Sequence, residues 1–146
     1  RTRILLADDH PQIRELLRVI LEPEFKVVGA AEDGETLLQY AQSLQPDVII
    51  SDINMPKVDG LQAARLLKDI APHTRVIFLT AHAEPSYVAA AFAAGAVGYL
   101  IKGATTDLAG SLRSMIDSVR AQKVTPHIPP AQARPSPSPT ELRPAR

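Results

Sequence analysis

Residues 48–60 read VIISDINMPKVDG, and this stretch is the strongest single indication of the fold. Residues 48–51 form a short, continuous aliphatic run, which is typical of a strand that is buried on both faces of a parallel sheet. Asp52 follows the run directly, and Pro56 and Gly60 supply turn chemistry before the next helical pattern. The stretch therefore predicts a buried strand whose carboxyl end carries an acidic side chain.

Four further aliphatic runs lie outward from this stretch, and helical patterns separate them. The predicted strands span residues 4–7, 26–30, 48–51, 76–79 and 98–101. Apolar stripes at helical spacing predict four helices, on Ile13, Leu16, Leu17, Ile20 and Leu21, on Leu37, Ala41 and Leu44, on Ala63, Leu66, Leu67 and Ile70, and on Leu108, Leu112, Met115, Ile116 and Val119. Residues 88–94 predict another helix, which is mostly alanine and has little side chain to anchor it.

Five alternations of strand and helix predict an α/β protein. Right-handed crossovers favour a doubly wound (βα)5 fold, with a five-stranded parallel sheet in the order 2-1-3-4-5, flavodoxin-like. The pattern covers residues 1–123, which we predict to be one domain. Residues 124–146 hold 7 of the 13 prolines, and we predict a Pro/Ser-rich linker or disordered tail there.

Composition excludes several classes of function. The chain has 146 residues, with 16 basic and 16 acidic side chains, so its zero net charge gives no reason to expect binding to nucleic acid or anionic membrane. Cysteine is absent, which excludes disulfides and thiolate metal sites. No apolar run approaches the roughly 20 residues of a membrane span, so we expect no membrane contact and a cytoplasmic location.

Polar side chains follow four of the predicted strands. They are Asp8-Asp9, Asp52, Thr80 and Lys102. Ligands of open α/β sheets bind beyond the carboxyl ends of the strands, and these four strands are neighbours in the predicted order. Three carboxylates, a hydroxyl and an ammonium group are therefore expected to meet in one pocket.

Charge suggests the chemistry of this pocket. Three close carboxylates repel one another, and a divalent cation removes the conflict. All-oxygen ligands suit magnesium, manganese and calcium and not zinc. Magnesium usually takes one or two carboxylates plus phosphate oxygens, which fits a site for phosphoryl transfer, with manganese as an alternative. One carboxylate can then act as a nucleophile toward a phosphoryl group, and Asp52 on the central strand is our candidate. Taken alone, the Asp8-Asp9 pair would be interpreted as a cap of the helix that follows. We expect His10 to be a solvated side chain, with a role as a further metal ligand as the alternative.

Four segments of the chain match a known family. They are ILLADDHPQIRELL at 4–17, SDINMPKVDG at 51–60, VIFLTAH at 76–82 and GAVGYLIKGA at 95–104. Residues 3–123 resemble the response-regulator receiver domains of two-component signalling, and these four segments carry the resemblance. Many receivers carry a proline after the lysine, but Gly103 stands there in this chain. The Lys102-Gly103-Ala104 motif resembles the NarL/FixJ-like subfamily, in which a LuxR-type helix-turn-helix domain follows the receiver.

The resemblance implies a CheY-like fold and a role for each matching residue. Asp52 is expected to be the phosphoacceptor, with Asp8, Asp9, Asp52 and the backbone carbonyl of Asn54 at the magnesium ion. Thr80 and Lys102 are expected at the phosphate, with Tyr99 as the switch aromatic. We also expect Met55 and His82 to border the pocket.

The implied function is that of a regulatory phosphoacceptor and not an enzyme. A sensor histidine kinase would phosphorylate Asp52, and the surface of residues 88–94, 98–101 and 108–119 would switch, controlling an output such as transcription. Other expected partners are a second copy of the chain after phosphorylation, and DNA only through an output domain absent from this chain. One alternative is a magnesium-dependent aspartyl-phosphate phosphohydrolase, which normally needs a lid. Another is a receiver-like adaptor that takes no phosphate.

Overall fold

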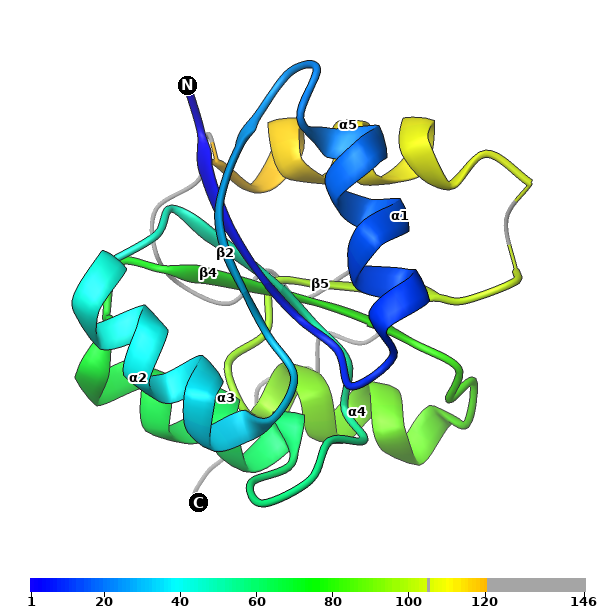
Figure 1. Ribbon diagram of the computed structural model, residues 1–146. Coiled ribbons are helices and arrows are strands. Elements are labelled where there is room, and N and C mark those ends of the chain that lie inside the picture. The colour runs from blue at the N-terminus through cyan, green and yellow to red at the C-terminus, as the bar shows by residue number, and fades with distance from the viewer. Residues whose placement is uncertain (105, 121–146) are drawn as a thin grey trace, which may run out of the picture.

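The computed structural model describes residues 1–104 and 106–120 (Figure 1). The predicted linker at 124–146, and the predicted end of the first domain at residue 123, lie outside the described residues.

Five parallel strands form one sheet. They are β1 (Arg3–Ala7), β2 (Lys26–Ala31), β3 (Val48–Ser51), β4 (Arg75–Thr80) and β5 (Gly98–Ile101). Their order is β2-β1-β3-β4-β5, and every neighbouring pair is parallel. The predicted doubly wound (βα)5 sheet is confirmed, and each predicted strand end lies within about one residue of the observed end.

Helices cover both faces of this sheet. They are α1 (Pro11–Leu21), α2 (Gly34–Leu44), α3 (Gly60–Ile70), α4 (Pro85–Ala93) and α5 (Leu108–Arg120). Figure 1 shows α1 and α5 on one face and α2, α3 and α4 on the other. Helix α4 begins before the predicted residue 88 because Pro85 occupies its first turn, where the missing N–H costs no hydrogen bond.

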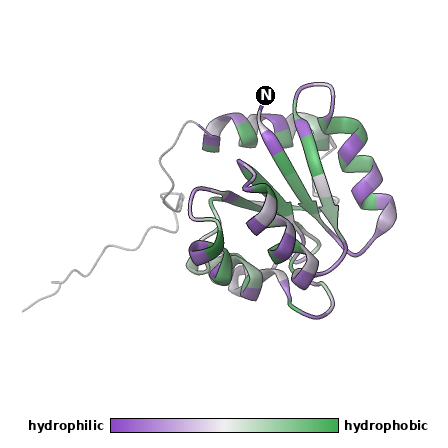
Figure 2. Ribbon diagram, turned by 60° about the vertical axis from the view of Figure 1, so that its left-hand side comes forward, coloured by the Kyte–Doolittle hydropathy of each residue, from purple (hydrophilic) through white to green (hydrophobic). Residues whose placement is uncertain are grey.

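Two apolar layers hold the helices against the sheet. Along β1, Leu5 belongs to the layer that packs against α2, α3 and α4, whereas Ile4 and Leu6 belong to the layer that packs against α1 and α5. Successive strand residues point to opposite faces, so a strand covered on both faces must be apolar at every position. Figure 2 shows the apolar strands between helices whose outer faces are polar.

One residue in each of two predicted apolar stripes is exposed. Leu16 of α1 is 45% exposed and Leu66 of α3 is 42% exposed, although the helices that these stripes predicted are confirmed. Leu17 and Leu67, which follow them, are buried at 1% and 3% exposure. Neighbouring residues differ by roughly 100° around a helix, so the leucine that follows lies nearer the centre of the face that packs on the sheet. The buried stripe is centred on the second leucine of each pair.

Candidate functional site

The carboxyl ends of four strands bring the predicted polar residues together. The N–H of Asp52 donates to the carbonyl of Ala7 at 2.9 Å, and the N–H of Lys102 donates to the carbonyl of Thr80 at 2.7 Å. These bonds continue the sheet one residue beyond its strands and place Asp52 beside the end of β1 and Lys102 beside the end of β4. A hollow of about 300 Å³ opens there. It is lined by His10, Ile13, Asp52, Asn54, Thr80, Ala81, His82 and Lys102.

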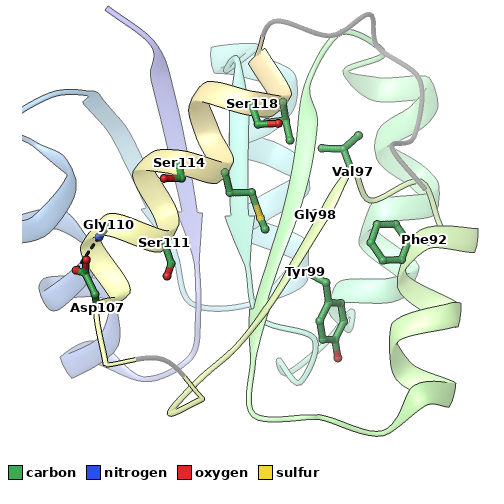
Figure 3. A pocket seen from close by; sticks show the side chains of 11 residues that line it. Phe92, Val97, Gly98, Tyr99, Asp107, Gly110, Ser111, Ser114 and Ser118 are labelled. Carbon is green, nitrogen blue, oxygen red and sulfur yellow. Dashed lines mark hydrogen bonds between the residues drawn. The ribbon is translucent and has the colours of Figure 1, made fainter. Parts of the chain in front are cut away.

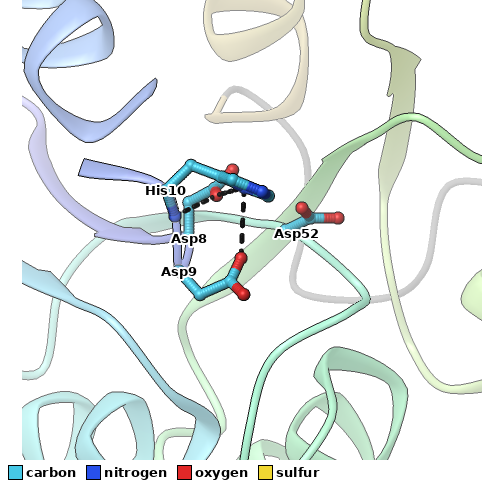
Figure 4. Close-up of side chains that lie close together, drawn as sticks. All are labelled: Asp8, Asp9, His10 and Asp52. Atoms are coloured by element: carbon cyan, nitrogen blue, oxygen red, sulfur yellow. Dashed lines mark hydrogen bonds and ion pairs between the residues drawn. The ribbon is translucent and has the colours of Figure 1, made fainter. Parts of the chain in front are cut away.

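The acidic side chains form a compact cluster at this edge (Figure 4). Ligand atoms of Asp8, Asp9, His10 and Asp52 all lie within 4.8 Å of one another. Asp8 and Asp52 are buried, at 1% and 4% exposure, while the Asp9 side chain is 36% exposed. The sequence prediction that three carboxylates converge is therefore correct in space.

Lys102 neutralises part of this charge. Its ammonium lies 2.7 Å from Asp8 Oδ2 and 2.9 Å from Asp52 Oδ2. Burial lowers the pKa of Lys102, but the hydrogen bonds to Asp8 and Asp52 outweigh burial, so the pKa is raised above its ordinary value. The lysine is therefore a permanent cation at neutral pH.

The donor set fits a divalent cation. Three carboxylates and one ammonium leave two negative charges in a partly buried place, and a divalent ion would balance them. Carboxylate oxygens are the ligands that magnesium and manganese prefer. Asp9 is the most accessible of the three carboxylates, and both oxygens of Asp8 already accept hydrogen bonds.

His10 lies on the acidic pair. Its side chain is 60% exposed, as expected for a solvated residue, but Nδ1 is 2.8 Å from Asp8 Oδ1 and 3.1 Å from Asp9 Oδ1 (Figure 4). The His10 N–H also donates to Asp8 Oδ1 at 2.9 Å, which closes the turn into α1. Asp8 thus serves the turn as well as the acidic cluster, but it does not cap the helix, because the N-cap residue of α1 is His10 and no side chain makes a cap hydrogen bond there. Arg14 donates to the Asp8 carbonyl at 2.6 Å and fixes the same turn, a contact that no sequence motif indicated.

The loop after β3 holds the Asp52 carboxylate in place. Asp52 Oδ1 accepts from the N–H of Ile53 at 2.6 Å, and Oδ2 accepts from Lys102. The loop then returns, and the N–H of Gly60 donates to the carbonyl of Ile53 at 2.7 Å. A Cβ at Gly60 would overlap the carbonyl oxygen of Asp52 and lie 2.9 Å from Ile53 Cα. The backbone can return this closely only at a glycine.

We expect Gly60→Ala to destabilise the protein by about 3 kcal/mol, because backbone atoms must move to admit the methyl group. Urea unfolding measures this loss. Gly103→Ala is the matched control, because no atom lies within 4 Å of the place that a Cβ would take there. Its φ is +80°, so the left-handed backbone conformation alone should lower the free energy of unfolding, by about 1 kcal/mol. Equal losses in the two variants would contradict the close approach at Gly60.

Asn54, Thr80 and His82 border the hollow. Asn54 Nδ2 lies 2.7 Å from His82 Nε2, and the N–H of His82 donates to Thr80 Oγ1 at 3.5 Å. Thr80 is fully buried. The structure does not bring Met55 to the hollow. This side chain is 8% exposed and packs in the apolar layer beneath α2 and α3, because burial there removes its apolar surface from water.

Tyr99 lies beside the hollow and not in it. Its hydroxyl donates to the carbonyl of His82 at 2.8 Å, and its ring packs against Phe78 at a centroid distance of 6.5 Å. It also lines a second hollow, of about 660 Å³, between α4 and α5 over β5 (Figure 3). Phe92, Val97 and Met115 give this hollow apolar walls. Tyr99 therefore connects the region near Thr80 with the α4–β5–α5 surface.

Burial raises the pKa of Tyr99 to about 12 from 10.0, and the carboxylates of Glu84 and Asp52 contribute to the rise. The neutral phenol therefore stabilises the folded state fully below pH 10, and this stabilisation is lost as the pH rises through about 12. We expect Tyr99→Phe to remove the last step of tyrosinate absorbance in an alkaline titration. Tyr40→Phe, on the exposed side of α2, should leave that step in place. If the step survives in Tyr99→Phe, the burial argument is wrong.

No helix within residues 1–104 and 106–120 has the length and apolar character that a bilayer crossing requires.

Known proteins share this fold at the level of a family. A sequence model of the family described as "Response regulator receiver domain" matches residues 4–113. The transcriptional regulatory protein DegU of Brevibacillus brevis is 43% identical over 109 residues, which are 73% of this chain and 46% of DegU. The chain spans about half the length of the curated relatives that it matches.

Solved structures agree with the sequence relatives. The response regulator domain of Thermotoga maritima CheB has a TM-score of 0.77 and 32% identity, over 84% of this chain and 98% of that chain. A two-component response regulator of the LuxR family, from Aurantimonas sp. SI85-9A1, has a TM-score of 0.78 and 28% identity, over 90% of this chain and 92% of that chain.

Proposed function

Because the chain belongs to the response regulator receiver domain family, with relatives of the LuxR type, we propose that Asp52 accepts a phosphoryl group in a magnesium-dependent reaction. The donor would be a sensor histidine kinase, and the protein would act in the cytoplasm. Phosphorylation would change the surface of α4, β5 and α5. The protein would be a regulatory phosphoacceptor and would turn over no external substrate.

One observation carries this proposal. Asp52 is 4% exposed, lies next to two further carboxylates, and has an ammonium 2.9 Å from its own carboxylate. A carboxylate oxygen in this place can form a bond to phosphorus while the bond from phosphorus to the donor nitrogen breaks, which leaves an acyl phosphate on Asp52. A magnesium ion, when bound, would offset negative charge on the transferring group.

The other site residues then have defined tasks. Asp8, Asp9, Asp52 and the Asn54 carbonyl would hold the metal, for which manganese is an alternative. Lys102 would exchange one carboxylate for a phosphoryl oxygen, since its ammonium already lies 2.9 Å from Asp52. Thr80 would turn its hydroxyl toward the phosphoryl group and donate a hydrogen bond.

The response would pass through Thr80 and Tyr99 to α4. Within α4 only Ala91 is buried, so this helix has a small apolar anchor and can shift at low cost. A change from almost all inactive to almost all active protein needs about 5.5 kcal/mol of differential stabilisation, which several charge-assisted hydrogen bonds can supply. The hollow in Figure 3 lies on the surface that would change.

The rest of the signalling system is proposed from the same premise. The altered surface would favour a homodimer or contact an output domain. Residues 124–146 would be the linker to a helix-turn-helix domain, which would contact DNA and control transcription.

We expect the phosphate mimic beryllofluoride, added with magnesium, to shift NMR signals across residues 84–104 and not only at the hollow. Thr80→Ala should bind the mimic but show a much smaller shift in α4, because the hydroxyl that moves toward the mimic is gone. Thr74→Ala, at the opposite end of β4, is the control and should respond as the wild type does. Shifts confined to the hollow in wild-type protein would argue against the proposed switch.

A further inference from the structure

His82 joins three elements that are separate in the sequence. Its Nε2 lies 2.7 Å from Asn54 Nδ2, in the loop after β3. Its ring stacks on Tyr87 of α4, with centroids 3.9 Å apart and planes 14° from parallel. Its backbone carbonyl accepts the hydroxyl of Tyr99, on β5, at 2.8 Å. We call Asn54, His82 and Tyr87 the rim unit.

The contacts orient the His82 ring. Nε2 is within hydrogen-bond distance of the Asn54 side-chain amide, at 2.7 Å. Nδ1 faces Glu84 Oε1 at 3.6 Å. Each edge of the ring therefore has a polar neighbour, while one face rests on Tyr87. The side chain is 22% exposed, so it is held by these contacts and not by deep burial.

The stack adds to a small apolar anchor, because Tyr87 in the first turn of α4 is only partly buried against the apolar layer. Ala91 is the buried residue of this helix, and it lies one turn beyond Tyr87. A stacked aromatic pair contributes about 0.5–1.5 kcal/mol beyond the area that it buries. Asn54 and His82 both line the hollow above Asp52, so movement of Tyr87 would reach the hollow through one ring.

We propose that His82 is a positioning residue, which is supported by Tyr87 and holds the Asn54 side chain over the hollow. The edge of the hollow and the first turn of α4 would then move as one unit. One consequence rests on the proposed function. Tyr87 does not line the hollow, yet it should influence the lifetime of the acyl phosphate on Asp52.

The first test needs no phosphate. NMR of the unmodified protein should show the Asn54 side-chain amide signals displaced in His82→Leu and also in Tyr87→Leu, but unchanged in Tyr87→Phe, which keeps the stacked ring. Amide hydrogen exchange in the first turn of α4 should rise roughly fivefold in His82→Leu and in Tyr87→Leu. The double variant should rise no further, because both changes remove one interaction.

Tyr40→Leu is the matched control, since Tyr40 is exposed on α2 and the change replaces the same residue type. It should leave both signals as in the wild type. Unchanged Asn54 signals in Tyr87→Leu, or exchange effects that add in the double variant, would overturn the inference.

The second test measures the acyl phosphate lifetime in the phosphorylated protein. It should change roughly fivefold, in the same direction, in His82→Leu and in Tyr87→Leu, and Tyr87→Phe should restore the wild-type value. A lifetime that responds to His82→Leu but not to Tyr87→Leu would overturn the positioning role. If wild-type protein takes no phosphate, the proposed function fails, and the first test alone still decides whether the rim unit exists.

Discussion

Asp52→Asn is expected to abolish phosphorylation by a small phosphodonor and to leave the protein folded. An amide oxygen is a far weaker nucleophile than a carboxylate, so no acyl phosphate should form. The amide can keep one acceptor oxygen for the N–H of Ile53, and it has nearly the shape of the carboxylate. Lys102 would retain its 2.7 Å contact with Asp8. Incorporation of label, followed by mass spectrometry, measures the effect.

The control for this prediction makes the same chemical change elsewhere. Asp69→Asn alters an exposed residue of α3 and should incorporate label as the wild type does. Circular dichroism of both variants checks that they fold. Undiminished label in Asp52→Asn would mean that another residue is the acceptor.

Removal of magnesium is expected to have the second large effect. A chelator should reduce phosphorylation to background, because the two uncompensated negative charges of the cluster would repel the incoming phosphoryl group. Asp9→Ala should weaken magnesium binding more than Asp8→Ala. The Asp8 oxygens already accept from His10 and Lys102, whereas the Asp9 carboxylate is exposed toward solvent. Asp8 would act behind the metal ligands, and loss of such a residue typically costs about 10- to 100-fold in metal affinity. The loss in Asp9→Ala should be larger.

Calorimetric titration with magnesium chloride gives the affinities directly and does not depend on phosphorylation. Asp69→Ala serves as the control for the removal of a surface carboxylate and should bind as the wild type does. If Asp8→Ala and Asp9→Ala both keep the wild-type affinity, the metal is not held by the acidic pair.

The sequence was sufficient for the sheet and for the convergence of the acidic residues. The central strands β1, β3 and β4 are buried on both faces, so each reads as an aliphatic run, and the polar residue that ends the run marks the edge of the sheet. Strand order then determines which ends meet. Asp8, Asp52 and Lys102 were found in this way, and the Lys102 ammonium lies 2.7 Å from Asp8 and 2.9 Å from Asp52.

Side-chain direction was harder to predict. Periodicity alone assigned both Leu16 and Leu17 to the apolar face, because it does not say where a helix touches the sheet. Met55 follows the acidic loop in sequence, yet its side chain turns into the core. The His82–Tyr87 stack was missed because it depends on two ring orientations across a loop, and no spacing rule encodes them.

Tandem mass spectrometry of the wild-type protein, after incubation with magnesium and a small phosphodonor, tests the central claim most directly. The account predicts a single phosphoryl group on the peptide that contains Asp52, stable in acid, lost in base and absent when a chelator is present. A phosphoryl group on any other residue, or an unmodified protein under these conditions, would contradict it.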